Sequence, residues 1–122
     1  MSEFGRRIRP YVEREILAAY HAKARGNPDV VFSHLERAHI LGQTSTVEHV
    51  RVHYHMFLWG IRQRNVREIL GQLLRIVGAS IGTPLGLVPQ GNTGGTNVTS
   101  FKSMPIPPEL AALIEKARTS WR

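Results

Sequence analysis

Five of the six histidines of this sequence lie between positions 34 and 55, and the stretch HVRVHYHM at residues 49–56 holds three of them. The chain contains no cysteine, so disulfide bonds, thiolate metal sites and cysteine nucleophiles are all excluded. Neutral imidazole groups, in contrast, are good ligands for borderline transition metals. The histidine cluster therefore raises the question of whether several of these rings meet at one metal ion.

The spacing of the histidines indicates which of them can converge. His49 and His53 are four residues apart, so on a helix they lie one above the other, and both fall on its apolar face. His55 falls among charged residues on the other side, where we expect it to be solvated. His39 lies three residues before Gly42, where the preceding helix is predicted to end. In an antiparallel hairpin His39 and His49 then stand at nearly the same height, with His53 one turn below.

The predicted ligands of one mononuclear metal ion are His39, His49, His53 and Glu36. Glu36 lies three residues before His39, so it can act as a fourth ligand or as the acceptor for a ligand's second ring nitrogen. Such a donor set suits Zn, Cu(II), Ni or Fe. His34, on the margin of the same helix, and Glu13, on the apolar stripe of the first helix, are additional candidates. In the alternative interpretation, the inward histidines are neutral core residues that hydrogen-bond to the backbone or to Glu13.

A second candidate feature is the glycine-rich stretch GNTGGTNV at residues 91–98. Backbone N–H groups around Gly91, Asn92 and Gly94 could point inward and form an anion-binding nest. The stretch lacks the lysine of a phosphate-binding loop, and no clear strand precedes it, so neither nucleotide-binding fingerprint applies. The alternative is a tight turn that needs the backbone freedom of glycine.

No residue pattern points to an enzyme active site. Ser33 and Ser45 lie in no nucleophile-elbow context, and no pair of acidic residues has a spacing that requires general acid–base chemistry. We therefore favour a protein without enzymatic activity, and leave the question open because a metal with an open coordination position would permit hydrolysis or redox chemistry.

Helix start and stop signals define four helices, predicted at about residues 10–25, 28–41, 46–62 and 66–78. Pro10 suits the first position of the first helix, and Asn27, Ser45 and Asn65 are suitable N-caps for the other three. Ser45 and Glu48 also have capping-box spacing. The turns are only a few residues long, so consecutive helices must be antiparallel neighbours. The sequence therefore predicts an all-α fold of two antiparallel helical hairpins or a small four-helix bundle.

The remainder of the chain has a different character. Residues 79–106 are rich in Gly, Pro, Thr and Asn and show no periodicity, yet they include several large apolar residues. We expect this irregular segment to lie against the helices, since a structureless loop of that length is unusual in a compact domain. A last helix is predicted at 108–119, and the whole chain, 1–122, is expected to form one domain.

Composition narrows the class of protein. Sixteen Lys and Arg against nine Asp and Glu give a formal charge of +7, but the basic residues are scattered and form no run with interleaved aromatics, which disfavours a nucleic-acid partner. The sequence has no stretch that we interpret as a signal peptide or a membrane span, so we expect a cytoplasmic protein. A protein partner or a homo-oligomer is compatible with this surface.

Several stretches taken together resemble a small bacterial family of unknown function. They are HLERAHILGQ at 34–43, HVRVHYHM at 49–56, GQLLRI at 71–76, GNTGGTNV at 91–98 and MPIPPEL at 104–110. The resemblance covers most of the chain from about residue 30 and implies no established activity. Residues 21–41 also resemble the tetratricopeptide pattern faintly, with Gly26 at the turn and Ala38 at a closely packed position, which is consistent with helical-hairpin architecture.

Three functions remain open at this point. The first is a transition-metal-binding accessory or carrier protein that uses His39, His49 and His53. The second is a helical-repeat module that binds another protein without metal, in which these histidines only fill the space between helices. The third is a basic protein that binds nucleic acid or an anionic surface, with the steep salt dependence that such binding implies.

Overall fold

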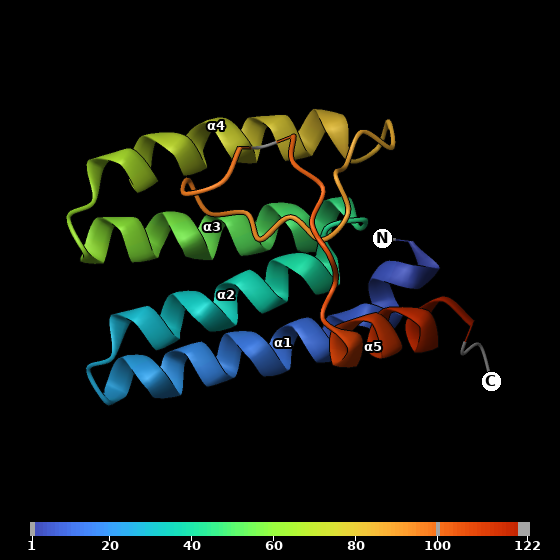
Figure 1. Cartoon of the computed structure of the whole chain (residues 1–122), viewed down its shortest axis with the longest axis horizontal. Helices are drawn as coiled ribbons and strands as arrows, with labels where there is room; N and C mark the ends of the chain where they lie inside the picture. The colour runs from blue at the N-terminus through green and yellow to red at the C-terminus, as the bar shows by residue number, and fades with distance from the viewer. Residues whose placement is uncertain (1, 100, 120–122) are drawn as a thin grey trace.

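The structure of the protein, a computed structural model, describes residues 2–99 and 101–119. Five α-helices make up the regular structure of this part of the chain (Figure 1): α1 (Glu3–Ala24), α2 (Pro28–Gly42), α3 (Thr46–Arg62), α4 (Val66–Gly82) and α5 (Pro108–Thr119). The predicted all-α fold is therefore confirmed.

The helices are arranged as two antiparallel hairpins. α1 packs against α2 and α3 packs against α4, and the hairpins meet through α2 and α3, while α5 lies against α1 and α2. Figure 1 shows the non-helical segment 83–107 running back along α3 and α4 before it reaches α5. The four predicted ligands, His39, His49, His53 and Glu36, therefore lie on the two inner helices, α2 and α3, and Glu13 lies on α1.

Side-chain caps fix the turns within and between the hairpins. The side-chain oxygens of Asn27, Ser45 and Asn65 each accept a hydrogen bond from the backbone N–H three residues ahead, as their positions predict. The predicted capping box at α3 is only half formed, because the Glu48 carboxylate does not return to Ser45. It is fully buried and accepts a hydrogen bond from Arg51 at 2.8 Å instead.

The first helix begins seven residues earlier than predicted. Ser2 caps it, with its hydroxyl oxygen accepting from the N–H of Gly5 at 2.9 Å, so Pro10 lies inside α1 rather than at its first position. Burial of Ile8 and Val12 on the α2 side stabilises the added turns. Pro10 is the residue type expected at the start of a helix, but the buried apolar face of α1 extends on both sides of it.

The fourth helix ends at Gly82, four residues later than predicted, so the irregular segment is 83–107 rather than 79–106. Gly78 does not stop α4, and the N–H of Thr83 still donates to the carbonyl oxygen of Ala79. The extension brings Thr83 to the level of the histidine cluster.

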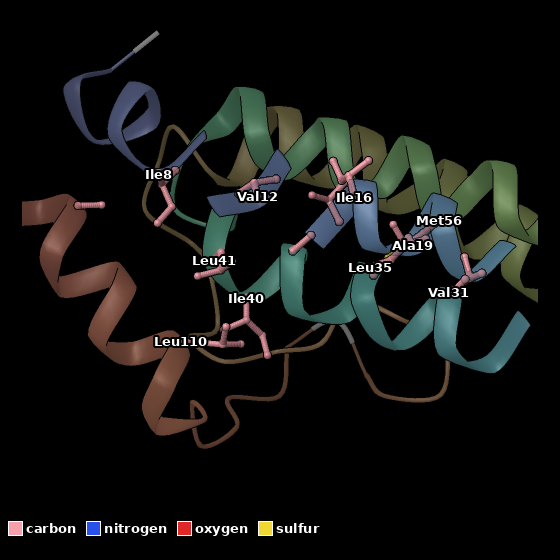
Figure 2. Packing of buried hydrophobic residues seen from close by; sticks show 14 residues of the cluster. Ile8, Val12, Ile16, Ala19, Val31, Leu35, Ile40, Leu41, Met56 and Leu110 are labelled. Atoms are coloured by element: carbon pink, nitrogen blue, oxygen red, sulfur yellow. The ribbon is translucent and has the colours of Figure 1, made fainter. Parts of the chain in front are cut away.

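The hydrophobic core is built from every helix except α4. Figure 2 shows the side chains of α1 facing those of α2, with Met56 of α3 at one end and Leu110 of α5 at the other. The buried cluster comprises Ile8, Val12, Ile16, Ala19, Ala22, Val31, Leu35, Ala38, Ile40, Leu41, Val52, Met56, Leu110 and Ala117. α4 buries mainly polar side chains, Glu68 and Gln72, together with Ala79. α4 is therefore held to the rest of the protein mainly by contacts outside this hydrophobic core.

No helix in the described part of the chain has both the length and the apolar character needed to cross a lipid bilayer.

Adjacent residues on α1 provide a test of this packing. Replacing Ile16, which is 4% exposed, with alanine should lower the free energy of unfolding by about 2–5 kcal/mol, because it leaves a cavity in the core. Replacing Leu17, which is 55% exposed, with alanine should change it by no more than about 0.5 kcal/mol. Urea denaturation of both variants measures the difference, and similar losses for the two would contradict the buried face described for α1.

Candidate metal centre

Three imidazole rings meet between α2 and α3. The Nε2 atom of His39 lies 3.0 Å from Nε2 of His49 and 3.1 Å from Nε2 of His53, and the last two atoms are 3.1 Å apart. All three side chains are buried. The predicted convergence is confirmed, and we call these residues the histidine triad: His39, His49 and His53.

Each ring of the triad directs its other nitrogen to an oxygen atom outside the triad. His39 Nδ1 donates to the backbone carbonyl oxygen of Asn92 at 2.6 Å, and His49 Nδ1 lies 2.7 Å from the hydroxyl of Thr83. His53 Nδ1 donates to the side-chain carbonyl oxygen of Gln72 at 2.6 Å. These oxygens come from α4 and from the segments that follow it, so the three rings are held from the side opposite the core.

Two of these contacts fix the tautomer of the ring. A carbonyl oxygen accepts and cannot donate, so Nδ1 of His39 carries a hydrogen. The amide nitrogen of Gln72 donates to Glu68 at 2.6 Å and to the carbonyl of Gly94 at 2.9 Å. Its carbonyl end must therefore face His53, whose Nδ1 carries a hydrogen for the same reason.

The Nε2 atoms consequently present lone pairs to one another. A neutral imidazole carries one N–H, so His39 and His53, protonated at Nδ1, have bare Nε2 atoms only 3.1 Å apart. Two lone pairs at that distance repel unless a cation lies between them. The triad can meet this need with a metal ion, with an added proton, or with a hydrogen on Nε2 of His49, whose Nδ1 would then accept from the Thr83 hydroxyl.

Burial disfavours an added proton, because that proton would give the triad a positive charge. It lowers the pKa of His39 well below the usual range, and the neighbouring rings of His53 and His49 lower it further. Burial also lowers the pKa of His49 to about 3 and that of His53 to about 4. The rings are thus neutral at pH 7, which is the protonation state that a metal ion requires of its histidine ligands.

A buried carboxylate stands behind the triad. Glu68 of α4 accepts from the amide nitrogen of Gln72 through one carboxylate oxygen, and from the backbone N–H and the hydroxyl of Thr96 through the other. It is 5% exposed. This negative charge, relayed to His53 through the Gln72 amide, favours a cation in the triad without itself touching it.

The triad forms part of the wall of a cavity of about 350 Å³. The rest of the wall comes from α4 and from residues 83–101, and it is mostly apolar, including Leu74, Leu87, Val88 and Phe101. Apart from the triad, Arg75 is the one titratable side chain among the described residues of the lining. A metal ion in the triad would therefore be open to the cavity on one side and enclosed by the helices on the other.

The glycine-rich loop closes over the triad rather than forming an anion nest. The N–H of Gly91 donates to the side chain of Gln43 at 2.9 Å, and the N–H of Gly94 donates to the side chain of Asn92 at 2.9 Å. These groups are therefore already bonded within the chain, which removes the donors that the predicted nest would need. Gly94 has φ +87°, and a Cβ atom there would lie 2.5 Å from the His39 ring. The loop needs glycine because its backbone lies directly on that ring.

The additional candidates lie outside the triad. Glu36 is half-buried and is not among the described residues whose ligand atoms gather with the triad; burial raises its pKa, and the charge of Glu68 raises it further. Glu13 accepts from Arg51 at 2.6 Å and is 44% exposed. His34 pairs with Glu15 at 2.9 Å, across to α1. His34 is thus turned towards α1, Glu36 towards Glu68 at the start of α4, and Glu13 towards Arg51 of α3, so none of the three points to the centre of the triad.

His55, expected to be solvated, is half-buried and lies 3.2 Å from the hydroxyl of Tyr20 on α1. It is not part of the triad, and it offers a matched histidine on the same helix for mutational comparison.

The oxygen atoms that contact the Nδ1 atoms of the triad were not predicted from the sequence. Gln72 had one usable signal: it lies four residues after Glu68, so two polar residues share the inner face of an otherwise apolar helix. The Asn92 carbonyl had none, since backbone groups carry no sequence signature.

Comparison with known protein families matches residues 6–114 to the family described as "protein of unknown function (DUF3703)". The chain belongs to this family. The matched region contains both hairpins, the triad and its oxygen acceptors, so the whole candidate centre lies within the DUF3703 domain. No curated protein and no solved structure shows a significant match to the chain.

The contact between the loop and His39 can be tested at two glycines with similar backbone angles. Gly94→Ala should destabilise the protein by about 1–3 kcal/mol more than Gly86→Ala, because both strain a positive φ but only Gly94 meets a ring. Gly86 has φ +75° and would meet nothing within 4 Å. Urea denaturation checks the difference; equal effects would mean that the loop does not rest on His39.

Proposed function

We propose that this DUF3703 protein binds one transition-metal ion through the Nε2 atoms of His39, His49 and His53, and serves as a metal carrier or accessory protein. The observation that supports this most is the convergence of three Nε2 atoms at 3.0–3.1 Å in a buried site. The bare Nε2 atoms of His39 and His53 need a metal ion or the hydrogen that a neutral His49 can carry on Nε2, and a metal ion satisfies all three rings at once.

The size of the triad suits a metal ion. His39, His49 and His53 could all reach one ion at the usual metal–nitrogen distance of about 2.0–2.1 Å. Such an ion keeps at least one coordination position for water or another ligand, and that position would open into the cavity.

The surroundings of the triad also fit. Histidine ligands of metals usually donate their second N–H to a carbonyl or carboxylate oxygen, and here Asn92, Thr83 and Gln72 supply three oxygens at 2.6–2.7 Å. A set of neutral nitrogen donors without thiolate or carboxylate favours Zn, Cu(II), Ni or Fe over Cu(I), Ca or Mg.

The residues that line the cavity favour transport of the ion over catalysis. Apart from the triad itself, no acidic, cysteine or histidine side chain occurs among its described lining residues. A water bound to the ion would therefore find no carboxylate beside it to act as a general base. The half-open cavity supplies a route for the ion to enter and leave.

The test is metal binding by untagged protein purified without chelator. We expect one equivalent of Zn, Cu, Ni or Fe per chain, measured by elemental analysis, and expect His39→Ala, His49→Ala and His53→Ala each to weaken binding by at least about 100-fold, since loss of an outer hydrogen bond alone costs 10–100-fold. His55→Ala, on the same helix as two of the ligands, should bind as wild type does.

A wild-type protein that takes up none of these metals at micromolar concentration, or a triple variant that binds as well as wild type, would overturn the proposal. The triad would then be a packing feature, and the helical-repeat interaction module would become the leading interpretation.

A further inference from the structure

The fourth helix has an apolar face that nothing in the described part of the chain covers. Among the described helices α4 packs against α3 alone, and its inner face is the one that carries Glu68 and Gln72. The outer face, defined here as Val66, Leu70, Leu73, Leu74, Val77 and Ile81, is between 46% and 75% exposed at every position. A continuous exposed apolar face of this kind is uncommon on a monomeric soluble protein and marks an interaction surface.

This outer face carries no charge over most of its length. Between Ile69 and Gly82 the one charged residue is Arg75, which turns inward and donates to the carbonyl oxygens of Gly94 at 3.0 Å and Val98 at 2.8 Å. The protein as a whole carries a formal charge of +7. The outer face of α4 is therefore a surface on which two copies can meet without bringing like charges together.

The spacing on the outer face suits helix–helix packing. Val66, Leu70, Leu73 and Val77 follow one another at steps of four, three and four residues, which is the seam of a coiled-coil heptad. Such a seam packs against an equivalent seam on a second helix. A second copy of this chain supplies that seam by symmetry.

The exposed apolar area is large enough for a stable dimer. Leu87 and Phe101, which are 72% and 90% exposed, line the cavity together with Leu74 and so extend the outer face beyond the helix. Together these side chains expose roughly 1000 Å² per chain, against about 800 Å² per partner in a standard interface and 300–600 Å² for the largest patch on a typical monomer.

Gly78 provides a second, independent indication. Glycine inside a helix costs about 1 kcal/mol relative to alanine, and a Cβ atom at Gly78 would meet nothing within 4 Å. At Gly71, in contrast, a Cβ atom would clash with Thr96 of the same chain. Packing within the chain thus explains Gly71 but not Gly78, which lies at the cavity wall beside Leu74 and leaves room there for a side chain of a second copy.

We propose that two copies of this chain associate through the outer faces of α4, helix against helix, about a two-fold axis. A lipid surface fits less well, because an interfacial helix carries Lys and Arg along its polar flanks, and α4 has none exposed beyond Arg67. Leu74 and Phe101 belong both to this surface and to the cavity wall. The second copy therefore also covers the entrance to the cavity beside the triad.

The oligomeric state of the purified full chain tests this inference independently of metal binding. Sedimentation equilibrium should give twice the 13.7 kDa chain mass. Leu70→Glu/Val77→Glu, which places four carboxylates on the seam of the dimer, should raise the dissociation constant at least 100-fold, with unchanged helicity, because both residues are exposed within one chain. Leu17→Glu, an equally exposed leucine on α1, should remain dimeric.

Three outcomes would overturn the inference. One is a wild-type protein that stays monomeric up to about 100 μM, a range in which dimers of this interface size assemble. Another is a dimer that persists in Leu70→Glu/Val77→Glu, or is lost equally in Leu17→Glu. The last is a monomer that sediments with phosphatidylserine vesicles only when the outer face is intact, which would assign the face to a membrane surface. Metal content is measured separately on the same proteins, so failure of the dimer and failure of metal binding by the triad are distinguishable.

Discussion

Three imidazole nitrogens held about 3 Å apart in a buried site need a cation, or the one hydrogen that His49 can carry on Nε2, between them, and much of the structure follows from that constraint. The α2–α3 hairpin brings the rings together, because two of them are four residues apart on one helix and the third lies near the end of the helix before it. The second ring nitrogens then require acceptors, which α4 and the glycine-rich loop supply. The site thus explains why α4 ends where it does and why the loop lies against α2.

The polar interior of the second hairpin also couples the site to folding. α4 contributes nothing to the main hydrophobic cluster, and its buried side chains are largely Glu68 and Gln72. Gln72 joins α4 to His53 and to the loop at once, while Asn92 holds the loop together through four hydrogen bonds of its backbone and side chain to His39, Gly94, Thr99 and Lys102. A cation that removes the repulsion within the triad would stabilise this whole network, so that ion binding and ordering of the loop reinforce each other.

Local signals in the sequence predicted the helices and the triad because both depend on short-range geometry. Caps at Asn27, Ser45 and Asn65 mark helix starts, and the phase of His49 and His53 follows from 3.6 residues per turn. The start of α1 was misjudged because Pro10 resembles a start signal while Ser2 is the true cap. The partners of the triad escaped prediction because they are 19 to 53 residues away in the chain. The spacing of Glu36 and His39 predicts that Glu36 is a metal ligand. Its position on α2, three residues before His39, instead directs its side chain towards Glu68. The engagement of the Gly91 N–H could not be predicted because its acceptor, Gln43, lies 48 residues away, whereas the Gly94 N–H donates to Asn92, two residues before it, in a local pattern typical of an Asn turn.

The most direct test of the central claim is to observe the protonation of the imidazole nitrogens. Long-range proton–nitrogen correlation NMR on uniformly nitrogen-15-labelled protein, recorded before and after one equivalent of Zn²⁺, distinguishes protonated, bare and metal-bound nitrogens in each ring. We expect Nδ1–H tautomers for His39 and His53 at pH 7, with the Nε2 signals of the whole triad shifting on addition of Zn²⁺ and those of His34 and His55 unchanged. Protonated Nε2 atoms in His39 or His53 that do not respond to Zn²⁺ would contradict that claim.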